Sequence, residues 1–283
     1  MRSPSPPPVS VIIPVYNHPA MVREALASVL AQTFRNFEIL AVDDGSTDDT
    51  PERLEEAAEG APLRVIRIEH CGKPGAVRNR GVEAARGELL AFLDSDDLWA
   101  PEKLESQLAL HGVASAAPRI SHTRERWLRN GREVSQGSQR HRRAGDLFVD
   151  SLKKCIIGPS TVMMERSLFE ELGGFREDVE IAEDYELWLR VTHREPVAYL
   201  DEALTVKRAG PWDQLSERHG GIELFRIQAL RELVEQGGFG DNPEHAAEAR
   251  RELGRKCRIY ASGCRKRGRE AEAQEYELLA RSL

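Results

Sequence analysis

A regular alternation of strand-like and helix-like segments between Val9 and about Leu110 constrains the fold of this chain more than any other feature. Four short runs are apolar or β-branched, and each is followed by a stretch with helical spacing or helix-capping residues. Near-continuous apolar strands alternating with helices indicate βαβ units and a parallel sheet covered on both faces. The expected strands are residues 9–16, 37–43, 63–69 and 88–94, and the expected helices are 19–33, 46–60, 73–87 and 100–112.

The alternation weakens after Gly112. The segment "WLRNGREV" predicts a β-hairpin with Asn130–Gly131 as its turn, because this dipeptide favours two-residue hairpin loops. The other expected elements are helices over 163–175 and 182–194, a short strand over 196–201 and, from about residue 220, helices only, with a break near Gly268.

Carboxylates follow the fourth expected strand, in the stretch "FLDSDD". Ligands of parallel α/β sheets bind beyond the carboxyl ends of the strands. Along an extended chain Asp94 and Asp96 point the same way, and they could hold one divalent cation, since Mg²⁺ and Mn²⁺ take oxygen ligands. Asp97 would point away, as a turn or capping residue. A solvated turn is the alternative for the whole triplet.

Two further acidic groups occupy comparable positions. Asp43 and Asp44 end the second strand, where carboxylates can accept hydrogen bonds from a base or from ribose hydroxyls. Asp184 opens the helix over 182–194, where the helix dipole favours the ionised form that a general base needs. Plain helix capping is the alternative for Asp184.

The order of these pieces resembles a known family. The segments that carry the resemblance, over roughly residues 9–208, are "VSVIIPVYN", "VLAQTFRNFEILAVDDGSTDDT", "GAVRNRGVEAARGELLAFLDSDDLWAPEKLE" and "EDYELWLR". Together they resemble the inverting glycosyltransferase family 2. The resemblance implies an α/β GT-A fold, a Rossmann-like and mostly parallel sheet flanked by helices, here with a C-terminal helical extension. It also implies a nucleoside-diphosphate-sugar donor, with a UDP-sugar favoured, and Mn²⁺ or Mg²⁺ as cofactor.

Site residues follow from the resemblance, position by position. Asp184 would be the catalytic base, and Asp44 would bind the nucleoside with Asp43 beside it. Arg78 would lie on a helix edge near the donor, with a plain surface arginine as the alternative. The residues expected at the nucleotide-sugar are Pro14, Tyr16, Asn17, Asp43, Asp44, Arg78, Asp94, Ser95, Asp96, Lys207 and Arg208, and those expected at the metal are Asp96, Asp94 and His219.

The resulting expectation is a metal-dependent inverting glycosyltransferase that acts on a glycan or lipid-linked acceptor in polysaccharide or glycoconjugate synthesis. The main alternative is a non-catalytic nucleotide-sugar-binding or scaffold protein of the same fold. A nucleotidyltransferase would need a glycine-rich basic loop after the first strand, and "IPVYNHPAMV" has none. Ser160 and Thr161 could touch the acceptor, or form a buried turn.

Four parts are expected: a disordered lead-in over residues 1–8, a nucleotide-sugar-binding half over 9–112, an acceptor-binding and catalytic half over 113–218, and the helical extension over 219–283. The extension could dock on the catalytic part or on a second copy of the chain as a homodimer. Its basic residues allow a peripheral contact with an anionic membrane as a further alternative.

Composition excludes several classes of protein. The net charge of −7, from 47 acidic and 40 basic residues, argues against nucleic acid as a partner. The four cysteines form no CxxC pair, which favours reduced thiols in the cytoplasm over zinc or disulfides. No apolar run approaches the ~18 residues of a membrane span, and the N-terminus lacks the apolar core of a signal peptide. A cytoplasmic protein, in some settings at the inner face of the membrane, is expected.

Overall fold

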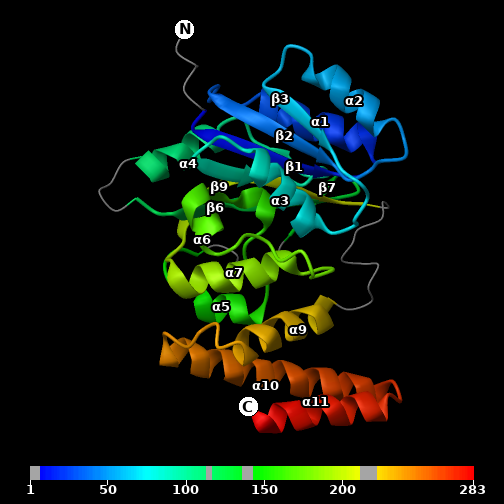
Figure 1. The fold of residues 1–283 in the computed structure, drawn as a ribbon, viewed down its shortest axis with the longest axis vertical. Helices are drawn as coiled ribbons and strands as arrows, with labels where there is room; N and C mark the ends of the chain where they lie inside the picture. The colour runs from blue at the N-terminus through cyan, green and yellow to red at the C-terminus, as the bar shows by residue number, and fades with distance from the viewer. Residues whose placement is uncertain (1–6, 113–116, 136–142, 211–221) are drawn as a thin grey trace.

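The computed structural model describes residues 7–112, 117–135, 143–210 and 222–283. A twisted sheet with helices on both faces forms one end of the molecule, and stacked helices form the other (Figure 1). The expected metal residue His219 and most of the expected lead-in over 1–8 lie outside the described residues. Within the described ranges, no helix has the length and apolar character needed to cross a bilayer.

The predicted strand–helix alternation of the first half is confirmed. Its four strands are mutually parallel in the order β3-β2-β1-β4, so the strand order reverses beside β1. A ligand crevice is expected at such a reversal. The elements are β1 (Val9–Val15), α1 (Pro19–Leu30), β2 (Phe37–Asp43), α2 (Thr50–Ala58), β3 (Leu63–Arg67), α3 (Pro74–Ala84) and β4 (Leu89–Phe92).

The second half continues the same sheet as β8-β6-β9-β5 and makes it mixed. β8 is antiparallel to β4, whereas β6 and β9 are parallel to each other. Its elements are β5 (Leu98–Trp99), α4 (Lys103–Gly112), β6 (Ile120–Arg129), β7 (Arg132–Val134), α5 (Phe148–Lys153), the 3-10 helix η1 (Pro159–Thr161), β8 (Met163–Glu165), α6 (Arg166–Glu171), α7 (Glu183–Arg194) and β9 (Ala198–Ala209).

Two expectations for this half are wrong in their boundaries. Residues 163–165 form β8 rather than the start of a helix, because both Met163 and Met164 are fully buried by pairing with β4 and β6. The strand expected over 196–201 extends to Ala209. The predicted hairpin turn is confirmed, with Asn130 and Gly131 both in the left-handed region at φ 50° and 73°.

Close packing of α3 on the sheet sets up the site. A Cβ on Gly81 would lie 2.5 Å from Cγ2 of Ile12, so only glycine lets the helix approach this far. Arg78 lies about one turn earlier on the same helix face, and it is buried. The helix therefore directs a buried guanidinium toward the strand ends.

The C-terminal helices pack on α5 and α7 (Figure 1). One hydrophobic cluster joins Leu253 of α10 to Phe148 of α5 and Leu189 of α7. At the far end of α7, Nδ1 of His193 lies 2.9 Å from Nδ1 of His245. The three helices are α9 (Ile222–Glu235), α10 (Pro243–Lys266) and α11 (Glu270–Ser282), with the expected break at Gly268.

Candidate active site

The turn after β4 brings its carboxylates to the sheet edge. The backbone N–H of Asp97 donates to the carbonyl of Asp94 at 2.9 Å and closes the turn. The side chain of Asp97 is buried and accepts hydrogen bonds from Ser160 Oγ at 2.7 Å and from the backbone N–H of Arg208 at 3.1 Å. Asp97 is thus a turn residue as expected, but its carboxylate does not face away. The chain turns here, so the alternation of an extended strand does not apply.

Ser160 ties this turn to η1. Its hydroxyl accepts the N–H of Asp94 at 3.1 Å while donating to Asp97, and its carbonyl accepts Nε1 of Trp99 at 2.8 Å. Burial raises the pKa of Asp97 well above its usual range, the charge of Asp96 adds to this, and Lys207 opposes it. Ser160 and Thr161 are both buried, which is the buried-turn alternative.

Arg78 joins the two acidic motifs. Its guanidinium donates to Oδ1 of Asp94 at 2.6 Å and to Oε1 of Glu183 at 2.7 Å, and its side chain is 5% exposed. The surface alternative for Arg78 is therefore wrong. Burial raises the pKa of Glu183 more than Arg78 lowers it, and the charge of Asp184 adds to the rise. One arginine thus holds residues 94 and 183 beside each other.

Asp184 follows at the start of α7 and is partly exposed. Its Oδ1 accepts the N–H of Tyr185 at 2.6 Å, and its Oδ2 accepts the thiol of Cys155 at 3.3 Å. Burial raises the pKa of Cys155 well above its usual range, and the charge of Asp184 adds to this. Cys155 is therefore a protonated donor to the carboxylate rather than a thiolate.

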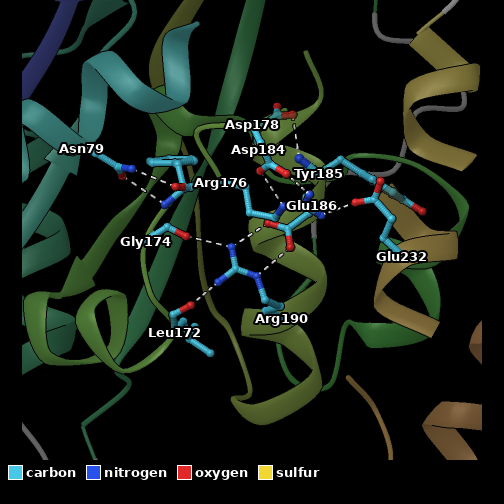
Figure 2. Close-up of polar contacts among 11 residues, drawn as sticks. Asn79, Leu172, Gly174, Arg176, Asp178, Asp184, Tyr185, Glu186, Arg190 and Glu232 are labelled. Carbon is cyan, nitrogen blue, oxygen red and sulfur yellow. Dashed lines mark hydrogen bonds and ion pairs between the residues drawn. The ribbon is translucent and has the colours of Figure 1, made fainter. Parts of the chain in front are cut away.

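Polar contacts hold the first turns of α7 in place (Figure 2). Arg190 donates to both carboxylate oxygens of Glu186, at 2.8 and 2.6 Å, and to the carbonyl of Gly174 at 2.8 Å. Asn79 of α3 pairs with both backbone groups of Phe175, at 2.8 and 3.1 Å. These contacts fix the helix that carries Asp184 relative to α3.

Lys207 and Arg208 come from β9, opposite the turn. Lys207 is an exposed residue on β9. Desolvation of its amine would by itself lower its pKa, but nearby carboxylates outweigh this and raise the pKa. Those carboxylates are, in order of effect, Asp97, Glu125, Asp94 and Asp184. Arg208 donates to the carbonyl of Asp96 and pairs with Glu24, so it braces the acidic turn.

The expected nucleoside end lies where β1 and β2 finish. Pro14, Tyr16 and Asn17 are all partly exposed there. Tyr16 stacks on His70, with ring centroids 4.1 Å apart. The side-chain oxygen of Asn17 accepts the N–H of Thr47 at 2.9 Å, which connects the ends of the two strands.

The neighbouring carboxylates at this end differ in their partners. Asp44 accepts the backbone N–H groups of Cys71 at 2.8 Å and Gly72 at 2.9 Å, so it holds the loop after β3. Oδ2 of Asp43 is buried and, among the described residues, meets no hydrogen-bond donor; Nε of Arg67 lies 3.5 Å away. A ligand donor could therefore satisfy Asp43 more readily than Asp44.

The acidic turn fits a hard divalent cation. Asp94, Ser95 and Asp96 are partly exposed at the sheet edge, and Mg²⁺ commonly binds through one or two carboxylates plus substrate phosphates. The described residues contain no group of three metal-ligating side chains.

The sequence did not predict the roles of several groups at the site. Glu183 was expected to help orient a substrate or to cap the helix, Asp97 was expected to turn or cap the chain, and no site role was expected for Cys155. Arg78 was expected near the donor, and a helical count could also have predicted its burial, since it shares a face with buried Val82. Nothing in the sequence indicates that Ser160 bonds to the acidic turn, because that contact spans 63 residues.

An α/β domain of GT-A type, with acids at the carboxyl ends of its strands, is typical of the proteins that use nucleotide-sugars. The sequence profile of Glycosyl transferase family 2 matches residues 10–173, more than half of the chain. An uncharacterised glycosyltransferase of Rickettsia felis is 36% identical over 200 residues. The chain belongs to glycosyltransferase family 2.

Coverage differs among the relatives. The Rickettsia felis match spans 71% of this chain but 33% of that protein, so the chain corresponds to about a third of its length. TuaG of Bacillus subtilis, described as a teichuronic acid biosynthesis glycosyltransferase, is 32% identical over 206 residues, covering 71% of this chain and 79% of TuaG.

Solved structures share the fold. Staphylococcus aureus TarS 1–349 in complex with UDP-GlcNAc superposes with a TM-score of 0.72 at 24% identity, covering 96% of this chain and 79% of that one. The mannosyltransferase PcManGT of Pyrobaculum calidifontis, in complex with GDP-Man and Mn²⁺, superposes at 0.57 and 20% identity, covering 98% and 86%. These similarities establish the GT-A fold.

Proposed function

We propose that this chain is a metal-dependent inverting glycosyltransferase. It transfers a sugar from a nucleoside-diphosphate-sugar, with a UDP-sugar favoured, to a hydroxyl of a glycan or lipid-linked acceptor in polysaccharide or glycoconjugate synthesis. The Arg78 bridge is the observation that carries this proposal. It holds Asp94, one of the expected metal residues, next to Glu183, the neighbour of the expected base. The glycan-synthesis context is supported by the similarity to TuaG.

In this mechanism Asp184 is the general base. It accepts the proton of the acceptor hydroxyl as the hydroxyl oxygen attacks the anomeric carbon, opposite the bond to the diphosphate. That bond breaks, the nucleoside diphosphate leaves, and the anomeric configuration inverts in one displacement. The thiol of Cys155 and the N–H of Tyr185 orient the carboxylate for this role.

The acidic turn and β9 provide the groups that would neutralise the charge of the diphosphate. Asp96 and Asp94 would hold Mn²⁺ or Mg²⁺, which when bound supplies positive charge to the leaving diphosphate. Lys207 adds a second cation that its carboxylate neighbours keep protonated. Asp43 takes the place of Asp44 as the proposed contact of the nucleoside, because the carboxylate of Asp44 is held by the amides of Cys71 and Gly72 in the wall of that subsite.

The test is turnover and binding with the full chain. A panel of UDP-, GDP- and dTDP-sugars with Mn²⁺ is screened for donor hydrolysis and transfer. Asp184→Asn should lower turnover by about 10²- to 10⁴-fold, the usual contribution of a general base. The Kd for UDP should stay within about threefold, since the base acts in the transition state. In the same titration, Asp43→Asn should weaken UDP binding.

The control is Asp178→Asn, a carboxylate near Asp184 whose side chain is 69% exposed and paired with Arg176 (Figure 2). It should keep full turnover. Full turnover in Asp184→Asn would remove the base assignment. Tight nucleotide-sugar binding without turnover in the wild type, for every donor, would instead favour the non-catalytic alternative.

A further inference from the structure

Two side chains of β6 share a sheet face with Lys207. In the parallel ladder between β6 and β9, Glu125 lies opposite Thr205 and Trp127 lies opposite Lys207. Residues paired across neighbouring strands present their side chains on the same face of a sheet. Thr205 marks which face this is, because its hydroxyl donates to the carbonyl of Ser160 at 3.1 Å. Glu125 and Trp127 therefore lie on the side of η1 and the acidic turn.

A β-bulge aims Glu125 at this site. The register between β6 and β9 shifts on both sides of Arg124, and bulges often re-aim a side chain beside an active site. The carboxylate of Glu125 lies close to Gly158, the residue before η1. If Gly158 carried a Cβ, that atom would be 3.3 Å from Oε2 of Glu125. The charge of Glu125 also acts on Lys207 together with that of Asp184. The carboxylate thus belongs to the same electrostatic environment as the proposed base.

A cavity of about 310 Å³ lies against this strand, at the small end of the range for ligand sites. Nε1 of Trp127 donates to Oε1 of Glu125 at 2.5 Å, which fixes the indole and the carboxylate relative to each other. The lining combines one indole and two small apolar side chains with four charged groups and one hydroxyl, so it is mostly polar and unsuited to an acyl chain. Its residues are Arg124, Glu125, Arg126, Trp127, Glu133, Val134, Ser135 and Ala203.

Carbohydrate rings match this chemistry. A pyranose has an apolar C–H face that an indole can cover, and hydroxyls at its edge that a carboxylate can accept. A carboxylate has about four acceptor positions, so Glu125 can accept a hydroxyl in addition to the indole N–H. We propose that Glu125 and Trp127 form the acceptor subsite of the enzyme, and that the acceptor places a pyranose ring on Trp127. This inference rests on the proposed glycosyl transfer.

Binding of methyl glycosides tests the subsite. Methyl glucoside, galactoside, mannoside and N-acetylglucosaminide are each offered to the full chain with UDP and Mn²⁺, and binding is followed by saturation-transfer NMR. At least one should bind. Trp127→Ala should weaken that binding by about tenfold or more, as loss of an aromatic anchor does. Trp127→Phe should restore most of it, and Glu125→Gln should weaken it without changing which ring face is saturated.

Arg132→Ala is the matched control, since Arg132 is exposed at the tip of the same hairpin and outside the cavity lining. It should bind the glycosides like the wild type. Each variant is checked for folding by its melting temperature and its response to UDP. Equal binding by Trp127→Ala and the wild type would overturn the inference. So would a wild type that binds UDP but none of the glycosides. Failure of the proposed function looks different, because then the wild type hydrolyses no nucleotide-sugar at all.

Discussion

Arg78 places one guanidinium between two carboxylates that lie 89 positions apart in the sequence, Asp94 and Glu183. Both contacts are short, and the arginine is almost completely buried. Removing one partner of such a group leaves an uncompensated charge in a low-dielectric environment, which costs far more than loss of a surface pair. Arg78 is therefore both a stabilising residue and the one that positions the two motifs.

We predict that Arg78→Met lowers the free energy of unfolding by about 3–5 kcal/mol, the usual cost of breaking a buried ion pair. Nearby Arg80 supplies the control. Its side chain is 43% exposed and pairs with Glu83 and Glu177, so Arg80→Ala should cost at most about 1 kcal/mol. Urea titration measures both. Equal losses in the two variants would mean that the Arg78 bridge is no stronger than a surface pair.

At the scale of elements, the sequence predicted best where local pattern and tertiary contacts agree. β2 was expected over 37–43 and has those bounds, because every residue in it is buried on both faces. β8 was missed, because a three-residue strand is decided by its neighbours in the sheet and not by its own sequence. The extent of β9 likewise depends on its pairing with β6.

In the candidate site, too, the sequence predicted the positions set by local pattern and not those set by tertiary contacts. Motif positions such as Asp94 and Asp184 could be placed at element ends from the sequence alone. The partners that orient them could not, because Ser160 contacts Asp94 across 66 positions and Cys155 contacts Asp184 across 29. Asp97 was misjudged for a related reason: the direction of its side chain depends on a turn that residues 94 and 97 close between them.

Helix α4 docks on the sheet with a buried amine at its start. Lys103 is fully buried, bonds to Gln107, and places Nζ 4.3 Å from the ring centre of Trp99. Burial holds the pKa of Lys103 well below its usual 10.5. The unfolded chain therefore binds a proton that the folded chain lacks, at every pH between the folded pKa and about 10.5. Wild-type stability should rise with pH through that window.

We predict that Lys103→Met removes this rise and is more stable than the wild type at neutral pH, because burial disfavours the charged amine of the wild type and methionine carries no charge. The free energy of unfolding should increase by about 1 kcal/mol or more. This is a net gain, because the side-chain oxygen of Gln107 loses its donor in the variant. The difference should shrink as the pH approaches 10.5. Urea unfolding at several pH values measures it. Parallel pH profiles for the two proteins would contradict a lowered pKa of the buried amine.

Over the whole molecule, the expected boundary at residue 219 does not divide the hydrophobic core. Leu253 and Cys257 of α10 lie in one cluster with Tyr185 and Leu189 of α7, the helix that begins beside Asp184. Nζ of Lys256 also donates to the carbonyl of Lys153 at 2.9 Å, at the end of α5. α11 contributes one fully buried residue, Ala273. Helices α10 and α11 therefore differ in how much of the core around α7 they cover.

We predict that a chain ending at Gly268 stays folded and keeps donor turnover, since it loses only α11. A chain ending at Asn242 should lose turnover and melt well below the full chain, because it uncovers the outer face of α7. Point variants separate this core effect from truncation itself. Leu253→Ala should cost about 2–5 kcal/mol, as for a buried leucine.

The exposed control is Ile259→Ala, at a side chain of α10 that is 58% exposed, and it should change stability by at most about 0.5 kcal/mol. Melting temperature and donor hydrolysis are measured for all four chains. If the chain ending at Asn242 kept both, α10 would be an appendage, and packing of α7 against α3, α5 and α9 would be enough to hold it. If Leu253→Ala lost turnover in proportion to its stability, the extension would act on catalysis only through the core that it shares with α7.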